Sequence, residues 1–387
     1  MALWQDSSQQ IQDLLSVADV RLDGARSHDI RVHHPEFYTA VLQHGSRGLG
    51  DSYVNGHWDC ERLDDCIHRL LAVDLNDRVR GLAKLQLAFS ALRARLWNLQ
   101  SIRRAHQVAH RHYNIDNDLF VRMLDSRMIY SCAYWERADT LEQAQRDKLD
   151  MICRKLELSR GERLLDIGCG WGGLAAHAAQ HYGVQVVGLT VSSAQQQMAR
   201  ERCRGLPVDI RLQDYRDLRD TFDKIVSVGM FEHVGVKNYG TFFDVVRRSL
   251  APHGIFLLHT IGSNVTTQGT DPWIDRYIFP NGKIPSAVEM SKALEGRWII
   301  EDWHNFGQDY DRTLMVWHRN VANAWPELSE RYDRRFYRMW SYYLLACAGY
   351  FRSRQGQLWQ LVITPRERTQ PYRSMRYRPV TPLLAAV

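Results

Sequence analysis

Residues 164–173, which read LLDIGCGWGG, restrict the fold of this chain more than any other segment does. The bulky residues before Gly168 predict a strand, and the residues after Gly173 predict a helix, with four glycines between these two elements. Glycine accepts positive φ angles and allows a ligand to approach the backbone closely. A strand, a glycine turn and the start of a helix together form a nucleotide-sized pocket at the carboxyl edge of a parallel sheet.

Asp166, directly ahead of the glycines, indicates which ligand this pocket holds. A carboxylate here would repel a pyrophosphate, but it suits a ligand with a positively charged amino group. S-adenosylmethionine carries such an amino group together with a sulfonium, and it has no phosphate. An ordinary tight turn is the alternative. We predict instead that this methyl donor contacts Asp166, Gly168, Gly170 and Gly173.

The chain after residue 163 alternates between strand-like and helix-like segments. Helices are predicted over 172–182, 193–203 and 239–250, the last with apolar residues at three-to-four spacing. Repeated strand–helix units imply an α/β fold with a doubly wound, mostly parallel sheet. The predicted strands cover residues 163–167, 184–190, 208–212, 224–228 and 254–260, and residues 314–318 offer a late edge strand.

The first 90 residues differ in character from the rest of the chain. Short amphipathic helices are predicted over 9–17, 35–44 and 63–73, and residues 45–60 are rich in glycine and aromatic side chains. A basic helical stretch over 82–99 leads into the strand–helix pattern. We predict a small helical N-terminal domain with its connector at 1–90, a catalytic domain at 91–365 and a basic tail at 366–387.

The cysteine pattern indicates a reducing compartment. The seven cysteines are scattered and form no CxxC pair, which argues for free thiols and against a zinc site. The N-terminus lacks an apolar signal core, and no run of about 18 apolar residues predicts a transmembrane helix. We therefore expect a cytoplasmic protein without a bound metal.

The formal net charge of +6 comes overwhelmingly from arginine. The planar guanidinium group suits the phosphates of nucleic acid and of anionic lipid equally well, so composition does not choose between these partners. A nucleic-acid methyltransferase would need a base pocket of the (N/D)PP(Y/F) type, and the sequence has no such motif. We therefore expect no nucleic-acid partner.

Polar residues follow two of the predicted strands, at the edge where ligands bind in such sheets. Thr190 and Gln195 come at the end of the second strand, where a ribose or the methionine part of the donor would be held. Gln213 and Asp214 follow the third strand, where a polar pair would bracket the adenine amino group. The alternative is that Thr190 only ends its strand and that the pair only forms a turn. No acidic residue ends the second strand, which argues against a dinucleotide.

A glutamate lies within the apolar segment VGMFEHVG, residues 228–235. A buried carboxylate is costly unless it finds a partner, so Glu232 is a strong candidate site residue. A histidine such as His259, in FLLHTIG, is more often a hydrogen-bonded core residue, but its strand ends beside the Glu232 loop. Spacing alone places neither Cys132 nor Tyr310, and a core role is the default for both.

Seven segments are more informative together than singly: YSCAYW (130–135), LDIGCGWGG (165–173), LTVSSAQ (189–195), SVGMFEHVG (227–235), LLHTIG (257–262), DPWIDRYIFPNG (271–282) and LLACAGYFRSRQGQLWQ (344–360). In combination they resemble the bacterial cyclopropane-fatty-acyl-phospholipid synthases, and the resemblance covers nearly the whole chain, including the N-terminal domain. The glycine motif is generic to methyltransferases, whereas the other six segments together are specific. The resemblance implies a seven-stranded, Rossmann-like methyltransferase sheet with a small helical N-terminal domain.

The resemblance also implies two sets of site residues, one for the methyl donor and one for a bicarbonate ion. A cysteine matching Cys347 has been proposed as active in the family as well. An alkene needs no covalent enzyme nucleophile, so we rank Cys347 below the other candidates. Besides the glycine loop, the implied donor residues are Tyr130, Ser131, Thr190 and Gln195, and the implied bicarbonate residues are Cys132, Glu232, His259, Ile261 (through its backbone) and Tyr310.

The reaction implied by the resemblance transfers the methyl group of S-adenosylmethionine to the cis double bond of an unsaturated phospholipid acyl chain. A base must then remove a proton so that a cyclopropane ring closes, and the bicarbonate would take that proton. The family also implies a homodimer that attaches from the cytoplasm to the inner face of the membrane. The N-terminal domain would handle lipid or support the dimer.

The segment RYDRRFYRMW, residues 331–340, alternates arginines with aromatic residues. Such a helix suits an anionic membrane surface. The alternative, which we weigh almost equally, is a solvated helix that packs its aromatic residues inward and does not contact a membrane. The C-terminal tail adds further positive charge through Arg366, Arg368, Arg373, Arg376 and Arg378.

Two alternatives to this function remain. A related methyltransferase acting on another unsaturated lipid or on a small amine is the nearer one, since a base formed by Glu232 and His259 could also serve an amine. A non-catalytic lipid-binding protein with the same fold is the alternative from another class. A degraded glycine loop or a missing Glu232 would indicate that class, and the sequence shows neither.

Overall fold

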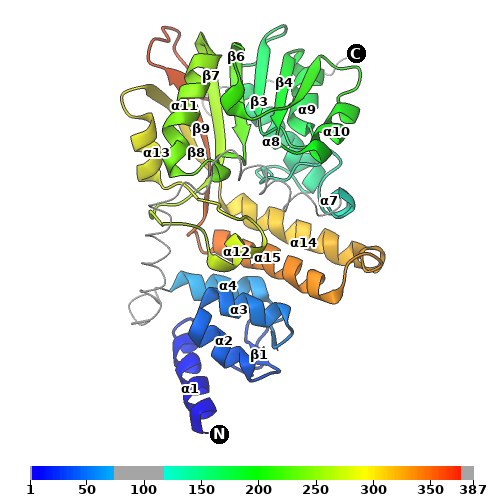
Figure 1. The fold of residues 1–387 in the computed structure, drawn as a ribbon, viewed down its shortest axis with the longest axis vertical. Helices are drawn as coiled ribbons and strands as arrows, with labels where there is room; N and C mark the ends of the chain where they lie inside the picture. The colour runs from blue at the N-terminus through cyan, green and yellow to red at the C-terminus, as the bar shows by residue number, and fades with distance from the viewer. Residues whose placement is uncertain (1, 74–116, 376–387) are drawn as a thin grey trace.

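The computed structural model describes residues 2–73 and 117–375. A seven-stranded sheet in the order β5-β4-β3-β6-β7-β9-β8 forms the upper part of the molecule in Figure 1. The first five strands in this order run parallel, and β9 pairs antiparallel with both β7 and β8. The strands are β3 (Arg163–Ile167), β4 (Gln185–Thr190), β5 (Val208–Leu212), β6 (Phe222–Val228), β7 (Leu250–Gly262), β8 (Trp298–Asn305) and β9 (Gln357–Pro365).

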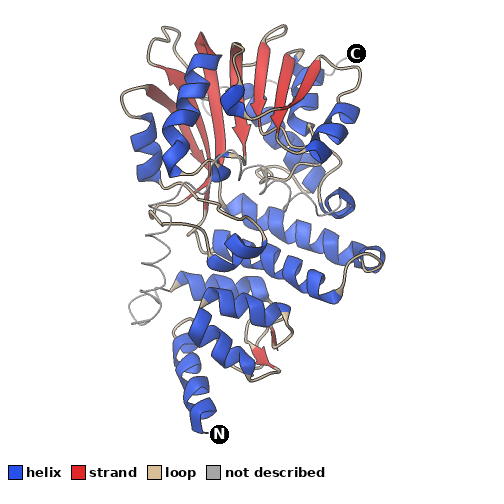
Figure 2. Cartoon of the chain, viewed as in Figure 1, coloured by secondary structure: helices blue, strands red, loops and turns tan. Residues whose placement is uncertain are grey.

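Helices cover both faces of the sheet (Figure 2): α8 (Leu141–Lys155), α9 (Gly173–Tyr182) and α10 (Ser193–Arg202) on one face, and α11 (Tyr239–Ser249) and α13 (Ala287–Leu294) on the other. The first layer shares a core with Leu164 of β3, whereas the second shares one with Leu165 of the same strand. Successive side chains of a strand point to opposite faces, so both faces of β3 are buried. The predicted doubly wound α/β fold is therefore confirmed.

The sequence predicted the parallel half of this sheet well, and β3 and β5 have the predicted bounds. The assignment of residues 314–318 to an edge strand was wrong. They lie inside α14 (Gln308–Leu328), where Leu314, Trp317 and Val321 are all buried at helical spacing. A short apolar run fits a strand or a buried helix equally well, and only the wider three-to-four spacing separates the two.

The antiparallel strands β8 and β9 were not predicted. β9 lies between β7 and β8, and eight of its nine residues are buried. The register of β9 against β7 places Gln360 directly opposite His259. This strand therefore brings a polar side chain from late in the sequence to a candidate site residue in the middle of the sheet.

A helical layer that contains the N-terminus lies below the sheet in Figure 1. It consists of α1 (Ala2–Ser16), α2 (Glu36–His44), α3 (Ser46–Val54) and α4 (Leu63–Ala72), with a two-stranded ladder of β1 (Arg31–Val32) and β2 (Trp58–Asp59). The long helices α14 and α15 (Arg334–Arg352) lie between this layer and the sheet, and α3 and α4 pack against α15. Glycine is required at the α15 contact, because a Cβ at Gly349 would lie 2.7 Å from the carbonyl oxygen of Asp64.

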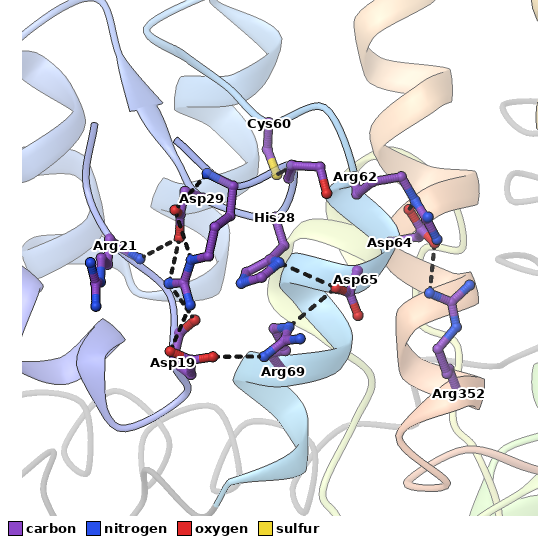
Figure 3. Close-up of polar contacts among 12 residues, drawn as sticks. Asp19, Arg21, His28, Asp29, Cys60, Arg62, Asp64, Asp65, Arg69 and Arg352 are labelled. Carbon is purple, nitrogen blue, oxygen red and sulfur yellow. Dashed lines mark hydrogen bonds and ion pairs between the residues drawn. The ribbon is translucent and has the colours of Figure 1, made fainter. Parts of the chain in front are cut away.

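Charged side chains join the helical layer to α15 (Figure 3). Arg352 donates to Asp64 of α4 at 2.6 Å and to Asp311 of α14 at 2.9 Å. Arg62 also pairs with Asp64, at 2.8 Å. Burial alone would raise the pKa of Asp64, but the hydrogen bonds from the two arginines outweigh burial and lower it. One buried carboxylate thus connects the N-terminal helices to the helix pair beneath the sheet.

Three sequence features fall partly or wholly outside the described residues: the predicted boundary at residues 90 and 91, the helical stretch 82–99 and the last part of the tail. Across residues 2–73 and 117–375, none of the helices is long and apolar enough to cross a membrane.

Candidate active site

The glycine loop after β3 has the backbone conformation that its sequence predicts. The φ angle is 87° at Gly168 and 54° at Gly170, which are values that other residues rarely adopt. Space is also limiting at Gly173, the first residue of α9, because a Cβ there would lie 2.5 Å from the carbonyl oxygen of Arg127. The bare backbone of this loop therefore forms one wall of the site.

A cavity of about 220 Å³ lies beside this loop, at the carboxyl ends of β3, β4 and β6. All ten residues that the sequence pattern and the family resemblance assigned to the methyl donor line this cavity, although they come from four separate segments. We call this space the donor cavity, and its ten predicted residues are Tyr130, Ser131, Asp166, Gly168, Gly170, Gly173, Thr190, Gln195, Gln213 and Asp214.

Hydrogen bonds orient the polar side chains at the ends of β4 and β5. Thr190 donates from Oγ1 to Oε1 of Gln195 at 3.0 Å and accepts the backbone N–H of Ser192 at 3.2 Å. Asp214 accepts two bonds from the guanidinium of Arg216, at 2.8 and 2.7 Å. Thr190 therefore does more than end its strand, and Asp214 is held by an arginine that also lines the donor cavity.

Two oppositely charged residues face the donor cavity from the core. Asp166 is 2% exposed, and burial raises its pKa to about 7 although the positive charge of Lys148 opposes this shift. Lys148 of α8 is 1% exposed, and burial lowers its pKa to about 8. Its Nζ donates to Ser131 Oγ at 2.8 Å. Sequence reasoning missed Lys148, although a lysine four residues after Ala144 and four before Ile152 puts a charge on a buried helix face.

Glu232 lies in a 3-10 turn, η2 (Phe231–His233), directly after β6. Its Oε1 accepts the backbone N–H of Ile261 at 2.7 Å, which ties this turn to the end of β7. Its Oε2 is buried and has no hydrogen-bond partner among the described residues. Burial raises the pKa of Glu232 to about 6, although the hydrogen bond from the backbone N–H of Ile261 acts in the opposite direction.

His259 lies opposite Val228 in the pairing of β6 with β7, so the histidine and the Glu232 turn are neighbours, as predicted. The side-chain amide of Gln360 lies 3.2 Å from His259 Nδ1. An amide nitrogen only donates, so Nδ1 accepts and the proton of the neutral ring is on Nε2. Nε2 is buried without a partner among the described residues. Burial, together with two nearby lysines, lowers the pKa of His259 well below its usual value.

Cys132, Ile261 and Tyr310 meet in one apolar group with the ring of Phe306. Burial raises the pKa of both Cys132 and Tyr310, so the thiol and the phenol stay protonated at neutral pH. The Phe306 ring lies 5.8 Å from the His259 ring, which joins this group to the histidine. We call Cys132, Glu232, His259, Ile261 and Tyr310 the buried cluster.

Cys347 lies on α15 and packs against a core that Tyr310 and Ile261 of the buried cluster also contact. Burial raises the pKa of its thiol to about 12, so it is not a thiolate at neutral pH. Among the described residues, no hydrogen bond joins it to the buried cluster.

Other residues of the donor cavity were not assigned from sequence. His233, beside Glu232, lines the cavity, and burial lowers its pKa to about 4, which keeps the ring neutral. Pro280 and Asn281 also line it, in the loop after α12 (Pro272–Tyr277), and Asn281 has a φ of 60°. The Pro-Asn-Gly run is a turn signal that could have marked this loop.

The basic aromatic segment 331–340 faces inward in part. It includes the start of α15, where Trp340 is fully buried. Arg338 pairs with Asp59 of β2 at 2.7 Å and donates to the carbonyl oxygen of Tyr53 at 2.6 Å. These contacts match the expectation of a helix that packs aromatic residues inward, whereas Arg334 remains exposed.

Comparison with known proteins connects this arrangement to one group of enzymes. The family model described as "Mycolic acid cyclopropane synthetase" matches residues 100–361. The cyclopropane-fatty-acyl-phospholipid synthase of Escherichia coli (strain K12) is 56% identical over 352 residues, which cover 91% of this chain and 92% of that protein. The S-adenosylmethionine-dependent methyltransferase UmaA of Mycobacterium tuberculosis is 34% identical over 271 residues, which cover 65% of this chain and 95% of UmaA.

Solved structures agree with these relatives. The cyclopropane synthase MmaA2 from Mycobacterium tuberculosis superposes with a TM-score of 0.63 at 31% identity, covering 67% of this chain and 97% of MmaA2. The mycolic acid cyclopropane synthase CmaA1, in complex with S-adenosylhomocysteine, gives a TM-score of 0.62 at 30% identity over the same shares of the two chains. Coclaurine N-methyltransferase gives a TM-score of 0.68 at 22% identity, and this similarity supports only a shared fold.

Proposed function

This chain belongs to the mycolic acid cyclopropane synthetase family of S-adenosylmethionine-dependent methyltransferases, and we propose that it adds a methylene bridge across the cis double bond of acyl chains in membrane phospholipids. The observation that carries this proposal is the 56% identity to a cyclopropane-fatty-acyl-phospholipid synthase across nine-tenths of both chains. The donor cavity and the buried cluster supply the chemistry that such a reaction needs.

The donor cavity suits S-adenosylmethionine at both of its ends. Asp166 offers a carboxylate for the positively charged amino group, and the bare backbone of Gly168 and Gly170 permits close contact with the ligand. Gln213 and Asp214 end the third strand, where a polar pair suits the adenine amino group. No phosphate-binding group is needed, and the carboxylate of Asp166 would repel one.

The reaction couples one bond formation to a later proton loss. The alkene π electrons form a bond to the donor methyl carbon while the methyl–sulfur bond breaks, which leaves a carbocation on the acyl chain. Removal of a proton from the new methyl group frees the C–H electron pair to close the three-membered ring. A cis double bond is a weak nucleophile, so the protein's part in the first step is chiefly positioning.

The buried cluster fits a small anion that could accept this proton. Glu232 Oε2 and His259 Nε2 are both buried without a partner among the described residues, and such atoms are rare unless a ligand or a water completes them. Together they offer one acceptor and one N–H donor, which a hydrogencarbonate ion, with its own O–H and its own acceptor oxygens, would satisfy. We propose that bicarbonate, held by Cys132, Glu232, His259, Ile261 and Tyr310, supplies the base when it is bound.

Glu232 is suited to hold this ion rather than to act alone. Its Oε1 is fixed by the backbone N–H of Ile261, so the direction of its free oxygen is fixed as well. Its raised pKa, about 6, favours sharing a proton with an anionic partner instead of repelling it. A protein carboxylate in contact with the carbocation would risk alkylation, whereas a small ion exchanges after each turnover.

We propose further that the protein works as a homodimer attached from the cytoplasm to the anionic inner surface of the membrane. The acyl chain of a phospholipid is accessible only at the bilayer. Exposed arginines at the start of α15, such as Arg334 and Arg335, would attract anionic lipid. Binding to anionic vesicles should weaken as salt is added, and salt-independent binding would contradict the electrostatic part. Light scattering in solution tests the dimer.

The decisive experiment for the reaction uses vesicles of unsaturated phospholipid with S-adenosylmethionine, in buffer with added bicarbonate and in buffer freed of it. Mass spectrometry should show acyl chains heavier by one methylene group, at a rate that rises with bicarbonate. Unchanged acyl chains, or methylation of an added amine instead, would overturn the lipid proposal. Product formed at the same rate without bicarbonate would overturn only the proposal that bicarbonate is the base, and the lipid substrate would stand.

A further inference from the structure

A fully buried lysine is costly unless a negative charge compensates it. Lys148 is 1% exposed, yet among the described residues no carboxylate oxygen lies within 4.0 Å of its Nζ. The acidic residues whose charges act on it are Asp125 and Asp166, both beyond ion-pair distance. The structure therefore leaves a buried positive charge facing the donor cavity without a direct anionic partner.

The hydrogen bond from Lys148 fixes the orientation of a second group. An ammonium has donors only, so Ser131 Oγ accepts in the 2.8 Å contact with Nζ. The hydroxyl proton of Ser131 is therefore directed elsewhere, and no acceptor for it lies within hydrogen-bond distance among the described residues. Because both residues line the donor cavity, a charged donor and a hydroxyl donor converge there on a place suited to an anionic oxygen.

The backbone around Ser131 is held by the same helix. Gln145, one turn before Lys148 on α8, donates from Nε2 to the carbonyl oxygen of Ser131 at 2.9 Å and to that of Ile129 at 3.4 Å. Gln145 and Lys148, which are neighbours on one face of α8, thus clamp Ser131: Gln145 holds its main chain and Lys148 holds its side chain. Such a clamp sets the hydroxyl before any ligand binds.

We propose that Lys148 and Ser131 hold the carboxylate of the donor's amino-acid end, with Lys148 as the positioning residue that supplies the charge and orients the Ser131 hydroxyl. Asp166 then takes the amino group of the same ligand, so the two charged ends of the methionine part meet opposite charges in one cavity. The inference rests on the proposed donor cavity and extends it by a residue on α8.

The test compares two ligands that differ only in the amino-acid end. S-adenosylhomocysteine has the carboxylate and the amino group, and 5′-methylthioadenosine has neither. By isothermal titration calorimetry, Lys148→Met should weaken binding of S-adenosylhomocysteine about 10- to 100-fold, as expected for a lost charge-assisted contact. It should change the affinity for 5′-methylthioadenosine by less than about twofold. Equal losses for both ligands would overturn the proposal.

The matched control is Lys155→Met. Lys155 is also fully buried on α8, but its Nζ contacts His304 and Asp302 outside the donor cavity. This variant should leave the affinity ratio of the two ligands unchanged, whereas the same selective loss in Lys155→Met would overturn the proposal. Ser131→Ala should weaken S-adenosylhomocysteine in the same selective way, and adding it to Lys148→Met should cost less than the sum of the single effects.

A pH series separates the charge of Lys148 from a packing role. The groups that face it are Asp125, Cys132 and Asp166, together with His259. Affinity for S-adenosylhomocysteine should fall in the wild type as pH rises above about 8, where Lys148 loses its proton. Lys148→Met should lack this fall, and an identical fall in both proteins would overturn the proposal. If the wild type binds neither ligand, the donor cavity itself is misassigned.

Discussion

The donor cavity and the buried cluster lie at the ends of neighbouring strands, but they differ in how their polar groups are satisfied. In the donor cavity, Thr190 and Asp214 are oriented by hydrogen bonds from within the protein. In the buried cluster, Glu232 and His259 each keep one buried atom without a partner among the described residues. The comparison indicates that the side chains at the ends of β4 and β5 are oriented before a ligand binds, whereas the two buried atoms of Glu232 and His259 are left for a ligand to complete.

The largest effect should come from the buried cluster. Glu232→Gln keeps the shape of the side chain but removes the charge and turns one oxygen into a donor. We expect turnover to fall about 1,000-fold, as for loss of general-base function, because the ion would no longer be held correctly. The affinity for S-adenosylhomocysteine should stay within about twofold of the wild type.

Turnover is measured with unsaturated vesicles and affinity by calorimetry, with the exposed Glu330→Gln as the surface control. Near wild-type turnover in Glu232→Gln would remove the proton-accepting role from this cluster. If Glu232→Gln also lost affinity for S-adenosylhomocysteine, the donor cavity and the buried cluster could not be treated as two functionally separate regions.

The reverse pattern should appear in the donor cavity. Asp166→Asn removes the negative charge that faces the donor's amino group, so affinity for S-adenosylhomocysteine should fall about 10- to 100-fold. Turnover at saturating donor should change far less, because Asp166 does not contact the reacting carbon in this assignment. A loss confined to turnover, with unchanged affinity, would contradict the assignment.

Donor affinity should also depend on pH. Burial raises the pKa of Asp166 to about 7, so its carboxylate is lost as pH falls through 7. Lys148, with a pKa lowered to about 8, loses its charge as pH rises through 8. Affinity for S-adenosylhomocysteine should therefore peak between these values and drop about tenfold by one pH unit below the pKa of Asp166. Calorimetry from pH 6 to 9 checks this curve, and Asp166→Asn should abolish its acidic limb.

The smallest effect should come from Cys347, which does not line the donor cavity and, in the part of the chain that the structure describes, is not hydrogen-bonded to the buried cluster. Cys347→Ala should leave turnover within about twofold of the wild type, since its thiol is neutral and contributes no hydrogen bond to the buried cluster. A large loss of turnover with an unchanged melting temperature would place this cysteine in the chemistry after all.

Most of the donor cavity could be predicted from sequence because eight of its ten predicted residues lie at or after strand ends, whereas Tyr130 and Ser131 came only from the family resemblance. In a parallel sheet the carboxyl ends of the strands meet at one edge, so local motifs such as Thr190 and Gln213 are brought together by topology alone. All ten predicted residues indeed line the cavity. Lys148 was missed because it belongs to a helix that precedes the sheet, and nothing in the strand pattern shows where that helix packs.

The buried cluster could be predicted less well from the strand–helix pattern. Periodicity left Cys132 and Tyr310 as core residues, and only the family resemblance placed them at the site. Their meeting depends on α14 and on the segment before α8, which are separated by about half of the chain. The partner of His259 is equally remote, because Gln360 lies on β9, an antiparallel strand that the repeated strand–helix pattern does not predict.

The position of β9 has a consequence for the order in which this enzyme matures. Gln360 sets which nitrogen of His259 carries the proton, and it reaches the histidine only when β9 inserts between β7 and β8. All the residues that line the donor cavity precede β9 in the chain, so this lining is synthesised before His259 gains its hydrogen-bond partner. We therefore expect the donor cavity to form earlier than the buried cluster, and the chemistry to start only after nearly all of the sheet has been assembled.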